Sequence, residues 1–188
     1  IRLSAGAGTR RIRRSSTIET LTDPLDPDQT FAYLYDSVKT ATVQYKFSWQ
    51  IDQYWPIGRR STIKTGIRGG SFISNPVFLN ELYRIGGNKL LRGFDEESIF
   101  VSTFNVLSAE FRFLLSKNSF FQVFMDAAYV EDRTLGKFRK DFPYGFGGGI
   151  TFETKAGMFA VSYALGSQQG NPINFRSAKV HFGYYNLF

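Results

Sequence analysis

The sequence predicts an all-β fold, an antiparallel transmembrane β-barrel of about eight strands, and three observations lead to it. Apolar residues alternate with polar ones over long stretches, as in the run Val43-Gln44-Tyr45-Lys46-Phe47-Ser48-Trp49-Gln50-Ile51. The connections between such stretches alternate between short and long. Aromatic residues make up 17% of the chain. A wall between lipid and a hydrated lumen needs two-faced strands, short turns at one end with long loops at the other, and aromatic girdles.

The alternation divides the chain into strands at 1–14, 31–55, 60–74, 99–115, 119–133, 143–154, 158–168 and 176–188. Their ends are set to within about 2–4 residues. The connections at 55–59, 116–118 and 155–157 are short turns, whereas those at 15–30, 75–98, 131–142 and 169–175 are long. No stretch has a helical period of apolar residues, and no apolar run approaches the roughly 20 residues of a membrane helix.

A soluble antiparallel sheet with one buried face is the alternative, because it shows the same alternation. Such a sheet has no reason to sort its connections by length. Bacterial outer-membrane barrels, in contrast, have short periplasmic turns and long external loops. We therefore favour a single outer-membrane barrel domain over residues 1–188, or the C-terminal half of a barrel.

The first predicted strand ends in a basic run, Arg10-Arg11-Ile12-Arg13-Arg14, which breaks the alternation just before a long external loop. Basic clusters at membrane surfaces attract anionic lipid head groups, so we interpret the run as a barrel rim facing lipid and lipopolysaccharide. A solvated charge run in a loop is the alternative. The net charge of +7 is also typical of a nucleic-acid binder. Many basic residues fall singly on polar strand faces, however, so we expect no nucleic-acid partner.

Two carboxylates are predicted to face the lumen from neighbouring strands. In the strand at 99–115, Glu110 alternates with the apolar Ala109 and Phe111. In the strand at 119–133, Asp126 alternates with Met125 and Ala127 in the same way. A carboxylate on the lipid side would be costly, so Glu110 and Asp126 belong on the polar side of the wall.

The last predicted strand has the pattern of a C-terminal assembly signal of outer-membrane barrels. Its polar His181, its Gly183 and its aromatic Tyr184 lead to a terminal Phe188. Asn186 stands where that signal normally has a hydrophobic residue, which weakens it.

The long connection at 75–98 contains Arg84-Ile85-Gly86-Gly87-Asn88-Lys89-Leu90-Leu91-Arg92-Gly93-Phe94, and here the chain resembles a known family. It is similar to the outer-membrane assembly and translocation superfamily of BamA, TamA and two-partner secretion transporters such as FhaC. The hallmark of that family is an Arg-Gly-Phe or Arg-Gly-Tyr tip on a long loop that folds back into a sixteen-stranded barrel. Four further segments also look like family strands, namely 108–111, 120–126, 145–150 and 157–164.

The resemblance implies that the chain corresponds to the last eight strands of the family barrel, without the periplasmic POTRA domains. It also implies that the tip, Arg92-Gly93-Phe94, meets the lumenal wall, where Arg92 pairs with Glu110, Asp126 or both. The interior of an eight-stranded barrel is only wide enough for its own side chains. We therefore expect a second copy or a longer chain to complete the wall around the loop, and otherwise a loop outside a small barrel.

By this resemblance the function is assembly or translocation of proteins, or of lipids, at the outer membrane of a Gram-negative bacterium, with client outer-membrane proteins as partners. A structural or porin-like barrel, as a dimer or alone, is one alternative. The anchor of a larger patatin-like autotransporter is another. We expect no enzymatic activity, no catalytic residue, no cofactor and no metal site, since the chain has no Cys, a single His and no Gly-x-Ser-x-Gly elbow.

Overall fold

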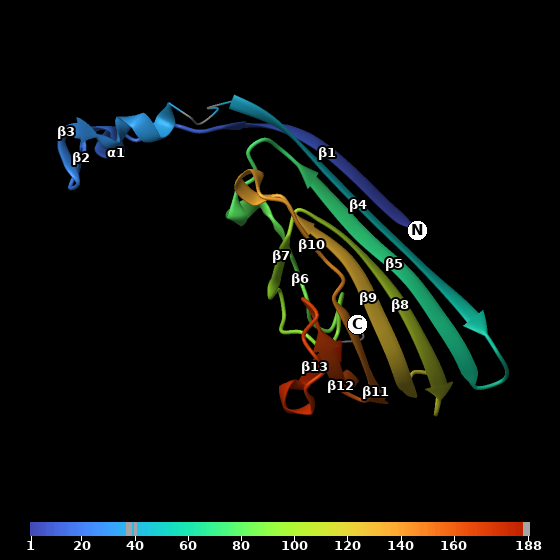
Figure 1. Cartoon of the computed structure of the whole chain (residues 1–188). Coiled ribbons are helices and arrows are strands. Elements are labelled where there is room, and N and C mark those ends of the chain that lie inside the picture. The colour runs from blue at the N-terminus through green and yellow to red at the C-terminus, as the bar shows by residue number, and fades with distance from the viewer. Residues whose placement is uncertain (37–38, 40, 186–188) are drawn as a thin grey trace.

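The computed structural model describes residues 1–36, 39 and 41–185 and consists mainly of one curved antiparallel sheet (Figure 1). The sheet has nine strands, eight of which form a continuous meander in which each strand pairs with the next along the sheet. The eight are β1 (Arg2–Arg11), β4 (Ala41–Pro56), β5 (Ser61–Ile73), β8 (Thr103–Leu114), β9 (Phe120–Asp132), β11 (Tyr144–Thr154), β12 (Gly157–Ser167) and β13 (Lys179–Tyr185). The ninth strand, the short β10 (Arg139–Asp141), pairs antiparallel with the last residues of β9. β1 and β13 are the two edges, and among the described residues they do not pair with each other.

The two faces of the sheet differ in chemistry, as the alternation predicted. The face that carries Glu110 and Asp126, which we call the inner face, holds most of the charged side chains of the strands. Large apolar side chains stand exposed on the opposite, outer face, for example Leu107 at 58%, Val123 at 59% and Phe182 at 66% exposure. An outer face of this kind fits contact with lipid acyl chains.

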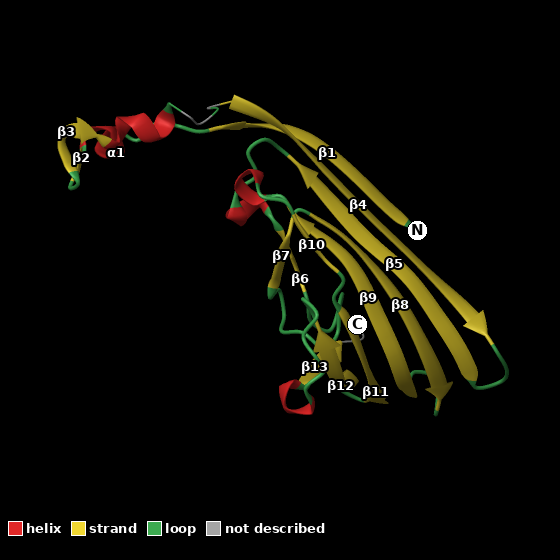
Figure 2. Cartoon of the chain, viewed as in Figure 1, coloured by secondary structure: helices red, strands yellow, loops and turns green. Residues whose placement is uncertain are grey.

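The connections follow the predicted lengths, with three short turns at one end of the sheet and long segments at the other. We call these ends the short-turn end and the long-loop end. The segment beyond β1 carries the short helix α1 (Ser16–Thr20), the hairpin of β2 (Thr22–Asp23) and β3 (Asp26–Thr30), and the 3-10 helix η1 (Phe31–Tyr35). This segment lies beyond the long-loop end of the sheet (Figure 2). Among the described residues no helix is long and apolar enough to cross a membrane.

Two predicted strands need correction, and the end of a third lies outside the described residues. The strand expected at 31–55 begins only at Ala41, because residues 31–35, Phe-Ala-Tyr-Leu-Tyr, form η1 instead of wall. The strand expected at 99–115 is divided: β7 (Ile99–Val101) pairs with β6 (Tyr83–Ile85) in the loop, and only β8 belongs to the wall. The last strand is described to Tyr185, so the predicted signal residue Phe188 and the neighbouring Asn186 lie outside the described residues.

The connection between β5 and β8, residues 74–102, lies against the inner face, and we call it the inner loop. It contains the 3-10 helix η2 (Leu79–Glu81) and the β6–β7 hairpin. A cluster of buried apolar side chains joins this loop to the inner face of β8 and β9, namely Ile85, Leu91, Phe94, Val101, Phe104, Val106, Ala128 and Val130. Burying apolar surface on both sides favours the docked position of the loop.

The face assignment predicts a difference between two neighbouring substitutions in β1. Ala5 lies on the outer face opposite Phe47, and Ser4 lies on the inner face opposite Ser48; both are exposed. Ala5→Lys should lower the free energy of unfolding in lipid by about 2–4 kcal/mol, because it places a charge in the hydrocarbon. Ser4→Lys, the matched control, should have a much smaller effect. Urea unfolding in lipid vesicles measures both, and equal effects would argue against a lipid-facing outer surface.

Candidate functional site: the docked tip of the inner loop

The tip of the inner loop is a tight turn followed by the segment Arg92-Gly93-Phe94. Gly86, Gly87 and Gly93 all have positive φ angles, of 113°, 93° and 94°. Glycine adopts such angles without the steric cost that a Cβ would add. An isolated bridge between Gly87 and Leu91 closes the turn and directs residue 92 toward the wall.

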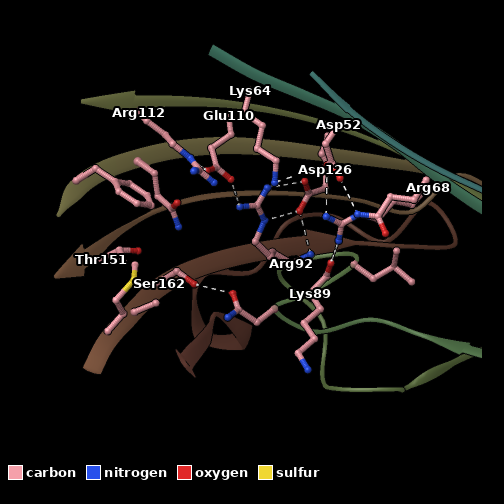
Figure 3. Close-up of a pocket in the computed structure, with 18 residues that line it drawn as sticks. Asp52, Lys64, Arg68, Lys89, Arg92, Glu110, Arg112, Asp126, Thr151 and Ser162 are labelled. Atoms are coloured by element: carbon pink, nitrogen blue, oxygen red, sulfur yellow. Dashed lines mark hydrogen bonds and ion pairs between the residues drawn. The ribbon is translucent and has the colours of Figure 1, made fainter. Parts of the chain in front are cut away.

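Arg92 inserts between two carboxylates of the inner face (Figure 3). Its Nε and Nη2 donate to Oδ2 and Oδ1 of Asp126, both at 2.7 Å, and its Nη1 donates to Oε2 of Glu110 at 2.7 Å. The backbone N–H of Arg92 also donates to Asp126 Oδ2, at 3.1 Å. A planar guanidinium can engage two acceptors in this way, which an ammonium group cannot.

The three charged groups are almost fully enclosed, with 8% of Arg92, 5% of Glu110 and 1% of Asp126 exposed. The guanidinium lies over the ring of Phe124, with 3.5 Å between its Cζ and the ring centroid. Arg112 donates from Nε to the second oxygen of Glu110 at 2.5 Å. Two cations thus balance two anions, which keeps an otherwise costly burial of charge favourable.

Glycines in β11 and β12 let the backbone of the tip approach the wall. A methyl group at Gly145 would clash with the carbonyl oxygen of Arg92. At Gly166 it would meet the carbonyl oxygen of Gly93 at 2.6 Å and the ring of Phe94 at 2.8 Å. The tip therefore packs directly on bare strand backbone, and any larger residue at these positions would push it away.

The far side of the tip reaches the edge strand β13. The backbone N–H of Gly93 donates to Nε2 of His181 at 3.4 Å, and Nζ of Lys179 lies 2.8 Å from a carboxylate oxygen of Asp95. The tip thus contacts every strand from β8 to β13 along the meander.

Comparison with known families shows to which family this sheet belongs. The chain matches the model of the Omp85 superfamily domain over residues 25–184. The chain belongs to the Omp85 superfamily. No curated protein and no solved structure is detectably similar to it. Omp85 membership implies a barrel, places proteins of this kind in the outer membrane, and groups the chain with barrels that are generally non-enzymatic and serve transport or assembly.

A polar cavity of about 480 Å³ lies between the Omp85 wall and the inner loop, on the short-turn side of the tip. Side chains that line this cavity give the wall a further contact with the loop. Arg68 of β5 donates to the carbonyl oxygen of Lys89 in the loop and, at 3.4 Å, to Oδ1 of Asp52. Lys64 lies 3.7 Å from the same carboxylate oxygen. Arg68 is therefore a wall residue that reaches the loop, the reverse of Arg92, which is a loop residue that reaches the wall.

The residues that the sequence singled out fall into three groups. The first comes together at the tip and consists of Arg92, Gly93, Phe94, Glu110, Asp126 and His181. Tyr184 lies on the outer face, where its hydroxyl donates to the carbonyl oxygen of Ala156 at 2.5 Å, and Gly183 lies on the inner face opposite Ala160. Phe188 falls outside the described residues. Their roles in docking and in assembly of the protein itself remain predictions.

Several residues of the site were not identified from the sequence. Phe124 shares the inner parity of Asp126, but nothing in the sequence paired its ring with the Arg92 guanidinium that lies over it. Phe104 and Val106 share the inner parity of Glu110 and form the apolar seat of the loop. That parity could have predicted the contact, because two apolar residues on a hydrated face indicate that another part of the chain packs against them. No sequence signal assigned Gly145 to the backbone of Arg92.

The ion cluster predicts energetic coupling between the loop and β9. Arg92→Ala and Asp126→Asn should each lower the free energy of unfolding by about 1–3 kcal/mol, because each leaves a partly desolvated group without its partner. The double variant should cost less than the sum, since the second substitution removes a contact that is already lost. Urea unfolding of the four proteins in lipid vesicles measures the coupling. Additive effects would show that the pair does not hold the loop.

The bare backbone beneath the tip gives a second prediction. Gly145→Ala should lower the free energy of unfolding by about 1–3 kcal/mol, because the added methyl group meets the Arg92 carbonyl. It should also speed trypsin cleavage after the exposed Lys89 near the tip. Gly8→Ala in β1 is the matched control, since nothing lies within 4 Å of the added methyl group there. Equal cleavage of the two variants would mean that the tip does not depend on this close approach.

Proposed function

We propose that this chain forms part of the wall of an outer-membrane barrel that assembles proteins in the membrane or translocates them across it. Membership of the Omp85 superfamily supports a role of this class. The observation that carries the proposal is the docked tip, in which Arg92 binds Asp126 and Glu110 on the inner face of the wall.

The geometry suggests what the docked loop does mechanically. A single loop is tied to strands that are far apart in the sheet, so the loop fixes the curvature of the wall on its inner side. The contacts of Arg92 are ionic and hydrogen-bonded, unlike the apolar cluster that holds the rest of the loop, and such contacts can exchange for water or for a partner more readily than a dry apolar core. A wall held in this way is stable at rest and can still change shape when a client protein passes along it or through it.

The proposal includes further strands at the two edges of the sheet. The row of backbone hydrogen-bonding groups on β1 and on β13 needs partners in a membrane, because lipid supplies none. These partners come from a second copy of the chain or from other strands of a sixteen-stranded barrel. Lipid and lipopolysaccharide on the outer face and client outer-membrane proteins at the inner face complete the set of proposed partners.

The experiment uses the full-length protein in the bacterium that makes it. Asp126→Asn releases the tip with a minimal change of shape, and Asp28→Asn, at an exposed position in the segment beyond β1, is the matched control. Quantitative mass spectrometry of the outer membrane and of the culture medium measures the outcome. We expect Asp126→Asn to lower, by about tenfold or more, the amount of a defined set of outer-membrane or secreted proteins, while Asp28→Asn leaves it unchanged.

The alternatives give different results in the same measurement. A structural or porin-like barrel predicts no change in any other protein. The anchor of a patatin-like autotransporter predicts loss only of the enzyme domain carried by the same chain. Either result would overturn the proposal, provided that immunoblotting shows the variant inserted at the normal level.

A further inference from the structure

A second cluster of charged side chains lies at the long-loop end of the wall, away from the tip. Nη1 of Arg10 in β1 donates to both carboxylate oxygens of Glu81 in η2, at 2.8 and 2.7 Å. Nη2 of the same arginine donates to the carbonyl oxygen of Pro76 at 3.1 Å. Its guanidinium also lies over the ring of Phe78, with 4.5 Å between Cζ and the ring centroid. One arginine of the wall thus contacts three residues in the first limb of the inner loop, residues 76–81.

Glu81 is held from several directions. Besides Arg10, it accepts a hydrogen bond from Nε2 of Gln44 in β4 at 2.6 Å and one from the backbone N–H of Phe78 at 3.0 Å. Burial by itself raises the pKa of Glu81, but these donors and the charge of Arg10 together lower the pKa below its ordinary value. The carboxylate therefore stays ionised at neutral pH. The side chains of Arg10 and Glu81 are only 14% and 15% exposed, so solvent screens the pair less than it screens a surface ion pair.

The neighbouring arginine shows that this contact is specific to one face. Arg10 belongs to the basic run that the sequence assigned to a lipid-facing rim, yet its side chain points inward to the loop. Arg11 lies on the opposite face, in register with Ala41, and is exposed. Arg10 therefore contacts the loop and Arg11 does not, so a substitution of Arg11 is a control for a substitution of Arg10.

We propose that Arg10 is a positioning residue, a second anchor that holds the first limb of the inner loop (residues 76–81) on β1 independently of the Arg92 tip. The two anchors lie on the same inner face but on different strands: Arg10 ties the start of the loop to the first edge of the sheet, and Arg92 ties its tip to β8 and β9. When Arg92 dissociates from Asp126 and Glu110, this limb stays bound to β1, so the tip remains close to its site and can bind there again. This anchor acts whichever substrate the barrel serves.

Spin labels at single cysteines test the proposal cleanly, because the chain has no Cys of its own. Leu79→Cys reports on the limb, since Leu79 is 61% exposed beside Glu81, and Lys89→Cys reports on the tip region. The readout is the ratio of mobile to immobile components in the electron paramagnetic resonance spectrum of the protein in lipid vesicles. In the Arg10→Gln background we expect this ratio to rise about tenfold at position 79 and to change little at position 89. Asp126→Asn should do the reverse.

Two further variants keep the result decisive. Arg11→Gln removes the neighbouring charge and should leave both labels unchanged. Glu81→Gln breaks the same ion pair from the loop side with almost no change of shape, so it reports on the anchor even when Arg10→Gln inserts poorly. The proposal is overturned when Arg10→Gln and Glu81→Gln leave position 79 as immobile as Arg11→Gln does. It is equally overturned when either variant mobilises positions 79 and 89 to the same extent, because the loop then has one anchor and not two.

Discussion

The buried contact of Arg92 with Asp126 and Glu110 is the interaction on which the arrangement of the inner loop depends. A guanidinium with 8% exposure is tolerable only because every nearby negative charge is aimed at it. The same contact fixes the path of the main chain, since the backbone N–H of residue 92 also donates to Asp126. The position of Gly93 and Phe94, and through them the approach to β12 and β13, follows from that fixed point.

The inner face is divided along the strands, and the division explains how the loop lies. Toward the long-loop end the inner side chains of β8 and β9 are apolar, including Phe104, Val106 and Val130, and the β6–β7 hairpin covers them. Toward the short-turn end the inner side chains become charged, with Glu110 and Arg112 on β8. The loop therefore packs on apolar side chains as it runs from the long-loop end toward the short-turn end. Its tip binds the first carboxylates along that path, those of Asp126 and Glu110. Apolar burial supplies much of the affinity, and the ion cluster decides where the tip stops.

Two arginines join the loop to the wall, one supplied by the loop and the other by the wall. Arg92 belongs to the loop and reaches the wall, whereas Arg68 belongs to the wall and reaches the backbone of Lys89. Contacts donated from both sides restrict sliding of the tip along the strands better than either alone, because each fixes a different point of the loop. The glycines beneath the tip make these contacts possible, since a Cβ at Gly145 would occupy the place of the Arg92 carbonyl.

The sequence by itself determined the strands of the wall and their faces. A period of two and connections of alternating length suffice for this, because every wall strand meets the same two environments. The parity of Glu110 and Asp126 likewise placed both carboxylates on one face before any contact was known. The exceptions were local: residues 31–35 have no polar residue in alternation and form η1, and residues 99–101 pair within the loop.

Only the tertiary structure decided how the inner loop meets that wall. The ring beneath Arg92 belongs to Phe124, the partner of Arg10 is Glu81 far along the chain, and Gly145 matters because of a backbone atom of residue 92. Each of these contacts joins residues that share no period and no register. Local alternation reports the environment of a side chain, while the identity of its partner depends on the path of the whole loop in space, which no short-range pattern encodes.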